Sequence, residues 1–244
     1  MVYALYRKTA QQGRQTHTRE RNHMKKLLSV LNIIAHSLIF VIVVVYFIAI
    51  TFRLDPSGKV VVTGSNSLRY FTVLSNLFQG LASLIIALSA VLGLKKSRWL
   101  SALQWAAATS VGLTFFTVLI FLGPPIHYQG MYDGSNLWFH LLIPIAAMLL
   151  FILSRDDKPL PLSWIGWSLA PMAVYGVFYT VNIAVNGFFS HGARNDFYNF
   201  LRGSWKNAPA SGLIMLATVA LIAAILWLSR RFIGHLISKA AKIA

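Results

Sequence analysis

Four polar side chains recur at helical spacing in the otherwise apolar segment 68–80. They occur at i, i+3, i+4 and i+7, which places them on one face of a helix: Thr72, Ser75, Asn76 and Gln79. Lipid cannot form hydrogen bonds with such a face, so we expect it to point into the protein. A hydroxyl on this face becomes a nucleophile when a neighbouring base accepts its proton.

The base that such a hydroxyl needs is predicted to be His140. Asn136 and His140 are four residues apart in an apolar segment, and an ionisable side chain inside a membrane indicates function by default. A neutral imidazole next to Thr72 would act as a general base, and the pair could form an acyl-enzyme with a carboxylic ester. Asn76 or Asn136 could then donate a hydrogen bond to the oxyanion.

Further polar residues are expected at the same depth. A third segment carries a polar stripe at i, i+4, i+7 and i+11, formed by Tyr175, Tyr179, Asn182 and Asn186. Another segment carries two threonines, Thr114 and Thr117. The plain alternative is that these groups join helices by hydrogen bonds. We interpret His36, four residues after Asn32 and away from the other polar residues, as structural.

The acidic residues limit the chemistry. All six lie outside the apolar segments, and Asp133 and Asp196 are the two that could reach a site from the loops and orient a histidine. One buried histidine without a membrane carboxylate falls short of a metal site, and the chain has no cysteine. Phosphate-loop and dinucleotide motifs are absent, so no metal or cofactor is expected.

Composition predicts an all-α, polytopic membrane protein. Hydrophobic residues make up 57% of the 244, only 11% are charged, and the mean hydropathy is +0.63. Six apolar runs are each close to the roughly 20 residues that cross a bilayer, and Pro144 predicts a kink in the fourth. The runs are 27–52, 70–94, 99–122, 136–153, 164–186 and 210–232.

Charge predicts the topology. Sixteen of the 22 Lys and Arg residues fall in the N-terminal tail, the second and fourth loops and the C-terminus, so both termini are expected in the cytoplasm. The basic tail 1–26 is predicted to be disordered and to touch lipid head groups, although Met24 could itself be a translation start. A six-helix domain, 27–233, and a cytoplasmic tail, 234–244, follow. Because this charge bias is a topology signal, nucleic acid is not an expected partner.

Four short motifs follow one another and resemble the bacterial branch of the androgen-induced / androgen-dependent membrane protein family. They are F-T-x-x-S-N (71–76), N-L-W-F-H-L-L-I-P (136–144), Y-G-V-F-Y-T-V-N (175–182) and N-D-F-Y-N-F (195–200). The animal members are six-helix threonine hydrolases that cleave fatty acid esters of hydroxy fatty acids. The resemblance implies Thr72 as nucleophile, His140 as the second essential residue, and a bacterial plasma membrane.

Two functions remain as expectations. The first is a hydrolase for a lipid or fatty-acyl ester on the outer-leaflet side, with Thr72, or alternatively Ser75, as nucleophile. The second is a binder or transporter of a small amphiphile without catalysis, or a structural membrane protein. A conduit is disfavoured because the inner part of the second run, 81–92, is almost wholly apolar.

Overall fold

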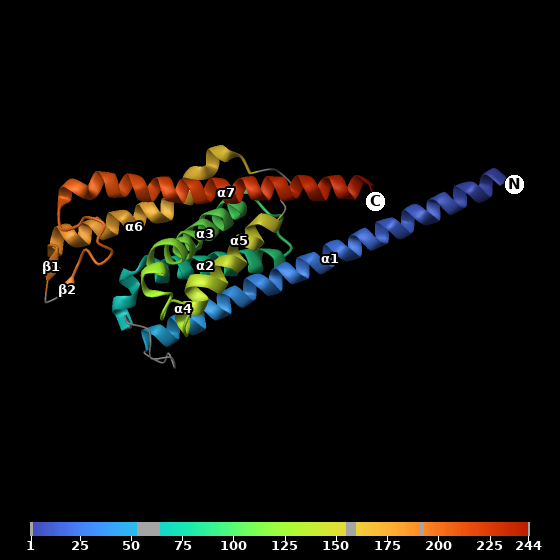
Figure 1. Cartoon of the computed structure of the whole chain (residues 1–244). Helices are drawn as coiled ribbons and strands as arrows, with labels where there is room; N and C mark the ends of the chain where they lie inside the picture. Colours follow the sequence, from blue (N-terminus) through green and yellow to red (C-terminus); the bar gives the residue numbers. More distant parts are fainter. Residues whose placement is uncertain (1, 53–63, 155–159, 191–192, 244) are drawn as a thin grey trace.

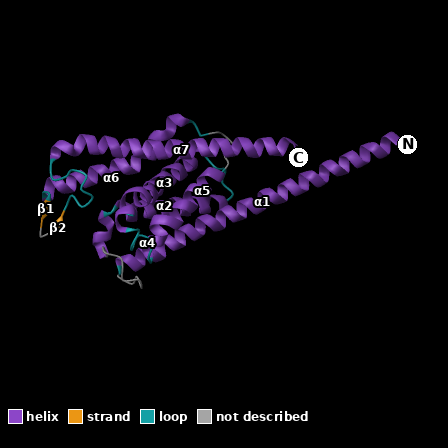
Figure 2. Cartoon of the chain, in the orientation of Figure 1, coloured by secondary structure: helices purple, strands orange, loops and turns teal. Residues whose placement is uncertain are grey.

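The chain folds into helices joined by short connections. The computed structural model describes residues 2–52, 64–154, 160–190 and 193–243. The α-helices are α1 (Val2–Thr51), α2 (Phe71–Val91), α3 (Arg98–Thr117), α4 (Ser135–Leu137), α5 (Ile143–Leu153), α6 (Ile165–Asn186) and α7 (Ala208–Ile243) (Figure 2). Two short strands, β1 (Phe189–Ser190) and β2 (Ala193–Arg194), pair antiparallel, with Phe189 opposite Arg194.

Short turns complete the chain. Turns of 3-10 helix cover Gly64–Arg69, Pro124–Ile126, Leu162–Trp164 and Trp205–Asn207, and single π turns cover Val118–Leu122 and Trp138–Leu142.

Six helical segments of the described chain are long and apolar enough to cross a membrane. They are Lys26–Thr51, Phe71–Val91, Arg98–Leu122, Ser135–Leu153, Leu162–Asn186 and Trp205–Ala240. These segments confirm the six predicted runs, most of them to within a few residues. Agreement is close because a run of about 20 apolar residues has few structures available to it other than a buried or lipid-facing helix.

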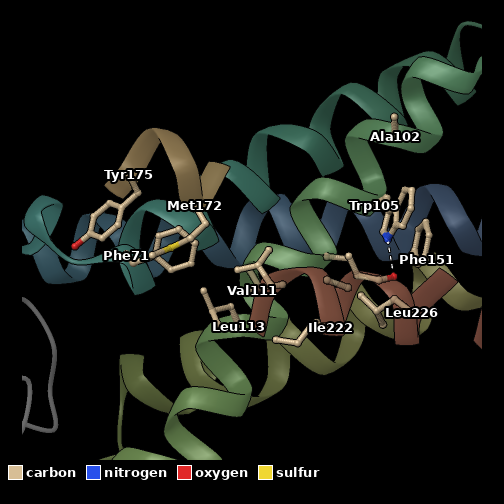
Figure 3. Close-up of a cluster of buried hydrophobic side chains, with 14 of the residues drawn as sticks. Phe71, Ala102, Trp105, Val111, Leu113, Phe151, Met172, Tyr175, Ile222 and Leu226 are labelled. Carbon is tan, nitrogen blue, oxygen red and sulfur yellow. Dashed lines mark hydrogen bonds between the residues drawn. The ribbon is translucent and has the colours of Figure 1, made fainter. Parts of the chain in front are cut away.

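Helix α3 occupies the centre of the bundle and contacts α2, α5, α6 and α7, while α1 packs on α2 (Figure 1). Its central position follows from its small side chains, because alanines and serines between Ser101 and Thr114 allow neighbouring helices to approach closely. Trp105 stacks on Phe151 of α5 and donates a hydrogen bond from Nε1 to the carbonyl of Ala223 in α7, 3.1 Å away (Figure 3).

Both chain termini lie at one end of the bundle, and the strands β1 and β2 and helix α4 lie at the opposite end (Figure 1). We call the second end the loop end, because it also carries the connections 123–134 and 187–204. The start of α2, the end of α3 and the end of α6 meet there.

In the structure α1 begins at Val2 and α7 ends at Ile243, so helix continues through both predicted tails, and their cytoplasmic location stays a prediction. Residues 2–26 were predicted to be disordered on the basis of their charge. They contain one glycine and no proline, and ten of the 25 are Gln, Arg or Lys. Such residues have high helix propensity and allow the membrane helix to extend beyond the bundle.

The predicted kink at Pro144 stays a prediction, and the structure shows the surroundings of this proline. It lies in the first turn of α5, directly after the π turn Trp138–Leu142, in which the amide of Ile143 bonds to the carbonyl of Trp138. In this register the carbonyl of Phe139 would accept from residue 144, but proline has no N–H. Asn76 of α2 supplies the missing donor, with its Nδ2 at 3.0 Å from the Phe139 oxygen.

Candidate functional site: a hydroxyl-lined cavity at the loop end

A cavity of about 420 Å³ lies between α2, α3, α6 and α7 at the loop end. Its size is typical of a site for one small molecule. The wall is mostly apolar, with several hydroxyl groups and one charged residue. It is formed by Phe71, Thr72, Leu113, Thr114, Thr117, Val118, Phe121, Leu122, Met172, Tyr175, Tyr198, Asn199, Phe200, Arg202, Ser211, Ile214, Met215 and Thr218.

Thr72 reaches this cavity from the first turn of α2. The first amides of a helix lack partners within the helix, and here the amide of Phe71 donates to the hydroxyl of Tyr198, 3.0 Å away. The hydroxyl of Tyr175 in α6 donates to the carbonyl of Arg69 just before the helix, at 2.8 Å. Two tyrosines therefore fix the start of α2 and the position of Thr72. Figure 3 shows Tyr175, Phe71 and Met172 side by side at this point.

Ser75 is a weaker candidate for the nucleophile than Thr72. Its hydroxyl donates to the carbonyl of Thr72 at 3.1 Å, and it lies 3.1 Å from the hydroxyl of Thr114. A hydroxyl has one proton to donate, so Thr114 is the donor in the second bond. Ser75 is buried and does not line the cavity, whereas Thr72 does.

His140 is held by the connection 123–134. Its Nδ1 lies 2.9 Å from the carbonyl of Met131, and Nδ2 of Asn136 donates to the carbonyl of Gly130 at 2.8 Å. A carbonyl can only accept, so Nδ1 carries the proton and Nε2 keeps its lone pair. This is the tautomer that a general base needs.

The pairing of Thr72 with His140 stays a prediction. His140 is not among the residues that form the cavity wall, and the hydrogen bonds of the described residues include none between these two side chains. Asp196, which could have oriented the histidine, is used elsewhere in the fold.

The inner part of the α2 stripe joins helices instead of lining the cavity. Besides bonding Phe139, Nδ2 of Asn76 donates to the carbonyl of Thr72 at 2.8 Å. Nε2 of Gln79 donates to the hydroxyl of Ser83 at 2.9 Å, and Nδ1 of His36 in α1 lies 3.1 Å from the same hydroxyl. The sequence places His36 away from the other polar residues, but in the structure it contacts Ser83 and, through it, the inner end of the α2 stripe.

The connection 187–204 is built around the completely buried Asp196. Its Oδ1 accepts from the hydroxyl of Tyr179 at 2.7 Å and from the amide of Leu201 at 3.3 Å, and its Oδ2 accepts from the amide of Gly203 at 3.4 Å. The amide of Tyr198 donates to the same Tyr179 hydroxyl at 3.1 Å. The carboxylate thus shapes the connection that closes the cavity, and Tyr179 supports it from α6.

Asn182 and Asn186 are not brought to the cavity. Nδ2 of Asn186 lies 3.1 Å from both the backbone and the side-chain oxygen of Asn182, one turn earlier in α6. Neither residue belongs to the cavity wall. They satisfy each other near the end of the helix, which is the local role that Asn often has at helix ends.

Several wall residues were not identified from the sequence. Ser211, Met215 and Thr218 follow helical spacing in α7, so this stripe was detectable. Tyr198 belongs to one of the quoted motifs but was not selected. Arg202 carries no local signal, because its position depends on how the connection 187–204 folds.

Tyr198 is a hydrogen-bond partner rather than a base. Burial raises the pKa of its phenol to about 12, so the hydroxyl stays protonated at neutral pH. The described residues that line the cavity include no histidine, carboxylate or lysine. The polar groups of these wall residues are therefore hydroxyls, the amide of Asn199 and one guanidinium, and a general base would have to approach from outside the wall.

The described residues contain no group of three or more His, Cys, Asp or Glu side chains that could hold a metal ion. Comparison with protein-family models, with curated proteins and with solved structures gives no match.

Proposed function

We propose that this multi-pass protein binds an amphiphile with one acyl chain, such as a fatty-acyl ester, in the cavity at the loop end. The observation that carries the proposal is the cavity itself: its volume is about 420 Å³, and its mostly apolar wall includes the hydroxyl groups of Thr72 and of several other residues. Apolar pockets with a few fixed polar groups are typical of small-molecule sites. Side chains that served only to join helices would fill such a space.

The orientation in the membrane belongs to the same proposal. With the termini in the cytoplasm of a bacterial plasma membrane, as the charge bias predicts, the cavity opens at the outer leaflet. Lipid could then enter laterally between helices without crossing the bilayer. The inner part of the bundle is closed by the stacked Trp105 and Phe151, which favours a binding site over a conduit.

Ester hydrolysis at this site is the second candidate, and the position of Thr72 in the wall favours it. The hydroxyl oxygen of Thr72 would attack the ester carbonyl and pass its proton to Nε2 of His140. The alcohol would leave with that proton, and water would then cleave the threonyl ester, releasing the fatty acid and restoring the hydroxyl. This is the activity that the resemblance to the androgen-induced / androgen-dependent family implies.

Binding is tested with a neutral monoacylglycerol that carries a photoreactive diazirine in its chain. Met215→Trp fills the cavity, and Leu213→Trp adds the same bulk on the same helix at a side chain that is 71% exposed, away from the cavity. We expect cross-linking to fall at least about fivefold in the first variant and to persist in the second. Equal cross-linking in the wild type and in Met215→Trp would refute the proposal.

Hydrolysis is tested separately with a fluorophosphonate probe and a lipid ester. The second candidate predicts labelling that is lost in Thr72→Ala and strongly reduced in His140→Ala. Labelling that persists in both Thr72→Ala and Ser75→Ala would exclude it, and would leave the binding proposal intact.

A further inference from the structure

We infer that Arg202 binds an anionic head group, a carboxylate or a phosphate, of the amphiphile whose chain occupies the cavity. This inference rests on the proposed function and adds the charge of the ligand to it. Arg202 is the one charged residue among the described wall residues, and the others are apolar or hydroxylic except for the amide of Asn199. A cavity with these features fits a molecule that has an apolar chain and a negative end.

The backbone at Arg202 is held in an unusual conformation. Its φ is +47°, in the left-handed region that non-glycine residues seldom adopt. The amides on either side, those of Leu201 and Gly203, donate to the two carboxylate oxygens of the buried Asp196. Such a conformation persists only where the surrounding structure enforces it, and it is frequent at ligand sites. Asp196 therefore fixes the direction from which Arg202 meets the cavity.

Arg202 differs from Arg69 and Arg194, two other arginines that the structure describes at the loop end. Arg69 donates to Oδ1 of Asn195 at 3.0 Å and lies over the ring of Phe197. Arg194 likewise donates to an asparagine, at 2.6 Å from Oδ1 of Asn199, and lies near an aromatic ring. Within the described chain the side chain of Arg202 has no hydrogen bond or ion pair. The nearby carboxylate of Asp196 accepts from the Tyr179 hydroxyl and from two backbone amides instead.

An arginine in this setting favours an anion without requiring a deeply buried ion pair. The residue is exposed, so a bound head group would remain partly hydrated. Partly hydrated pairs are worth little individually, and two parallel hydrogen bonds to one carboxylate or phosphate strengthen them. We therefore expect a preference of about five- to tenfold for an anionic over a neutral amphiphile of equal chain length.

The test uses the neutral photoprobe described above and three competitors with the same chain: palmitate, 1-palmitoyl lysophosphatidic acid and monopalmitoylglycerol. On the full-length wild type, we expect at least one anionic competitor to displace the probe at about five- to tenfold lower concentration than monopalmitoylglycerol. A gain with palmitate alone identifies a carboxylate ligand, and a gain with the lysolipid alone identifies a phosphate.

Arg202→Asn removes the charge while asparagine tolerates the left-handed backbone, so the connection keeps its shape. We expect this variant to lose the anionic preference, so that palmitate, the lysolipid and monopalmitoylglycerol displace the probe at similar concentrations. Arg202→Lys should keep part of the preference, because it retains the charge without the planar fork. Arg194→Asn is the matched control and should behave like the wild type.

Three results would overturn the inference: equal displacement by anionic and neutral competitors, an anionic preference that survives in Arg202→Asn, or the same loss in Arg194→Asn. Each of these leaves the proposed function standing, because the neutral probe is still bound. Failure of the wild type to cross-link the neutral probe would refute the proposed function instead.

Discussion

Asn76 supplies the donor that Pro144 lacks, and this compensation can be measured. Replacing Asn76 with Leu keeps a side chain of similar size but removes the hydrogen bond to the Phe139 carbonyl, 3.0 Å long and buried. A buried carbonyl without a donor costs about 1–3 kcal/mol, and interhelical hydrogen bonds in membranes reach about 1.7 kcal/mol. We therefore expect Asn76→Leu to lower the free energy of unfolding by about 1.5 kcal/mol.

The same substitution should cost much less in a Pro144→Ala background. Residue 144 then has an N–H that can donate to Phe139 in the existing π register, so the carbonyl no longer depends on Asn76. The expected coupling energy is about 1 kcal/mol. It is measured as a double-mutant cycle by equilibrium unfolding in mixed micelles, followed by tryptophan fluorescence. An equal cost of Asn76→Leu in both backgrounds would refute this account of the π turn.

Three further predictions concern the packing around the cavity. The pKa of Tyr198 is raised to about 12 against an ordinary value of about 10, so its contribution to the free energy of unfolding is complete below pH 10 and is lost as the pH rises to 12. Tyr198→Phe should reduce this loss of stability, as measured by unfolding curves at a series of pH values. Asp196→Ala leaves the Tyr179 hydroxyl and two amides without their acceptor, so hydrogen exchange in 197–203 should accelerate at least about tenfold while the core of α3 is unaffected. A Cβ at Gly80 would lie 2.8 Å from Val43 of α1, so Gly80→Ala should destabilise the protein by about 1–3 kcal/mol. Val43→Ala should reduce that cost in the double variant. Additive effects of the two substitutions would contradict close packing of α1 on α2.

The sequence predicts the helices well and their ends less well. The six membrane segments are determined locally, because apolar length alone separates a bilayer-spanning helix from other structures. The charge of residues 2–26 indicates a disordered tail, whereas their helix propensity favours the helix that the structure has there. The surroundings of Pro144 involve another helix: a π turn precedes the proline, and Asn76 supplies the donor that the proline lacks.

The candidate site is predictable only where one helix carries the information. The stripe on α2 and the tyrosines of α6 have helical spacing, and the structure does place Thr72 and Tyr175 in one wall. Arg202 depends on a connection that Asp196 shapes through tertiary hydrogen bonds. His36 bonds to Ser83, 47 residues away, and no local pattern predicts such a contact.

The polar stripe of α2 therefore has two parts with different roles. Its outer part, Thr72 with Ser75 behind it, contacts the cavity, directly or through Thr114. Its inner part, from Asn76 inward, donates to the π turn and to Ser83, whose hydroxyl also contacts His36 of α1. Substitutions in the inner part should change stability and leave the affinity for the photoprobe unchanged, because binding and helix association use different side chains of the same face. Loss of probe affinity in Gln79→Leu at unchanged stability would show that the cavity extends further inward than its present wall.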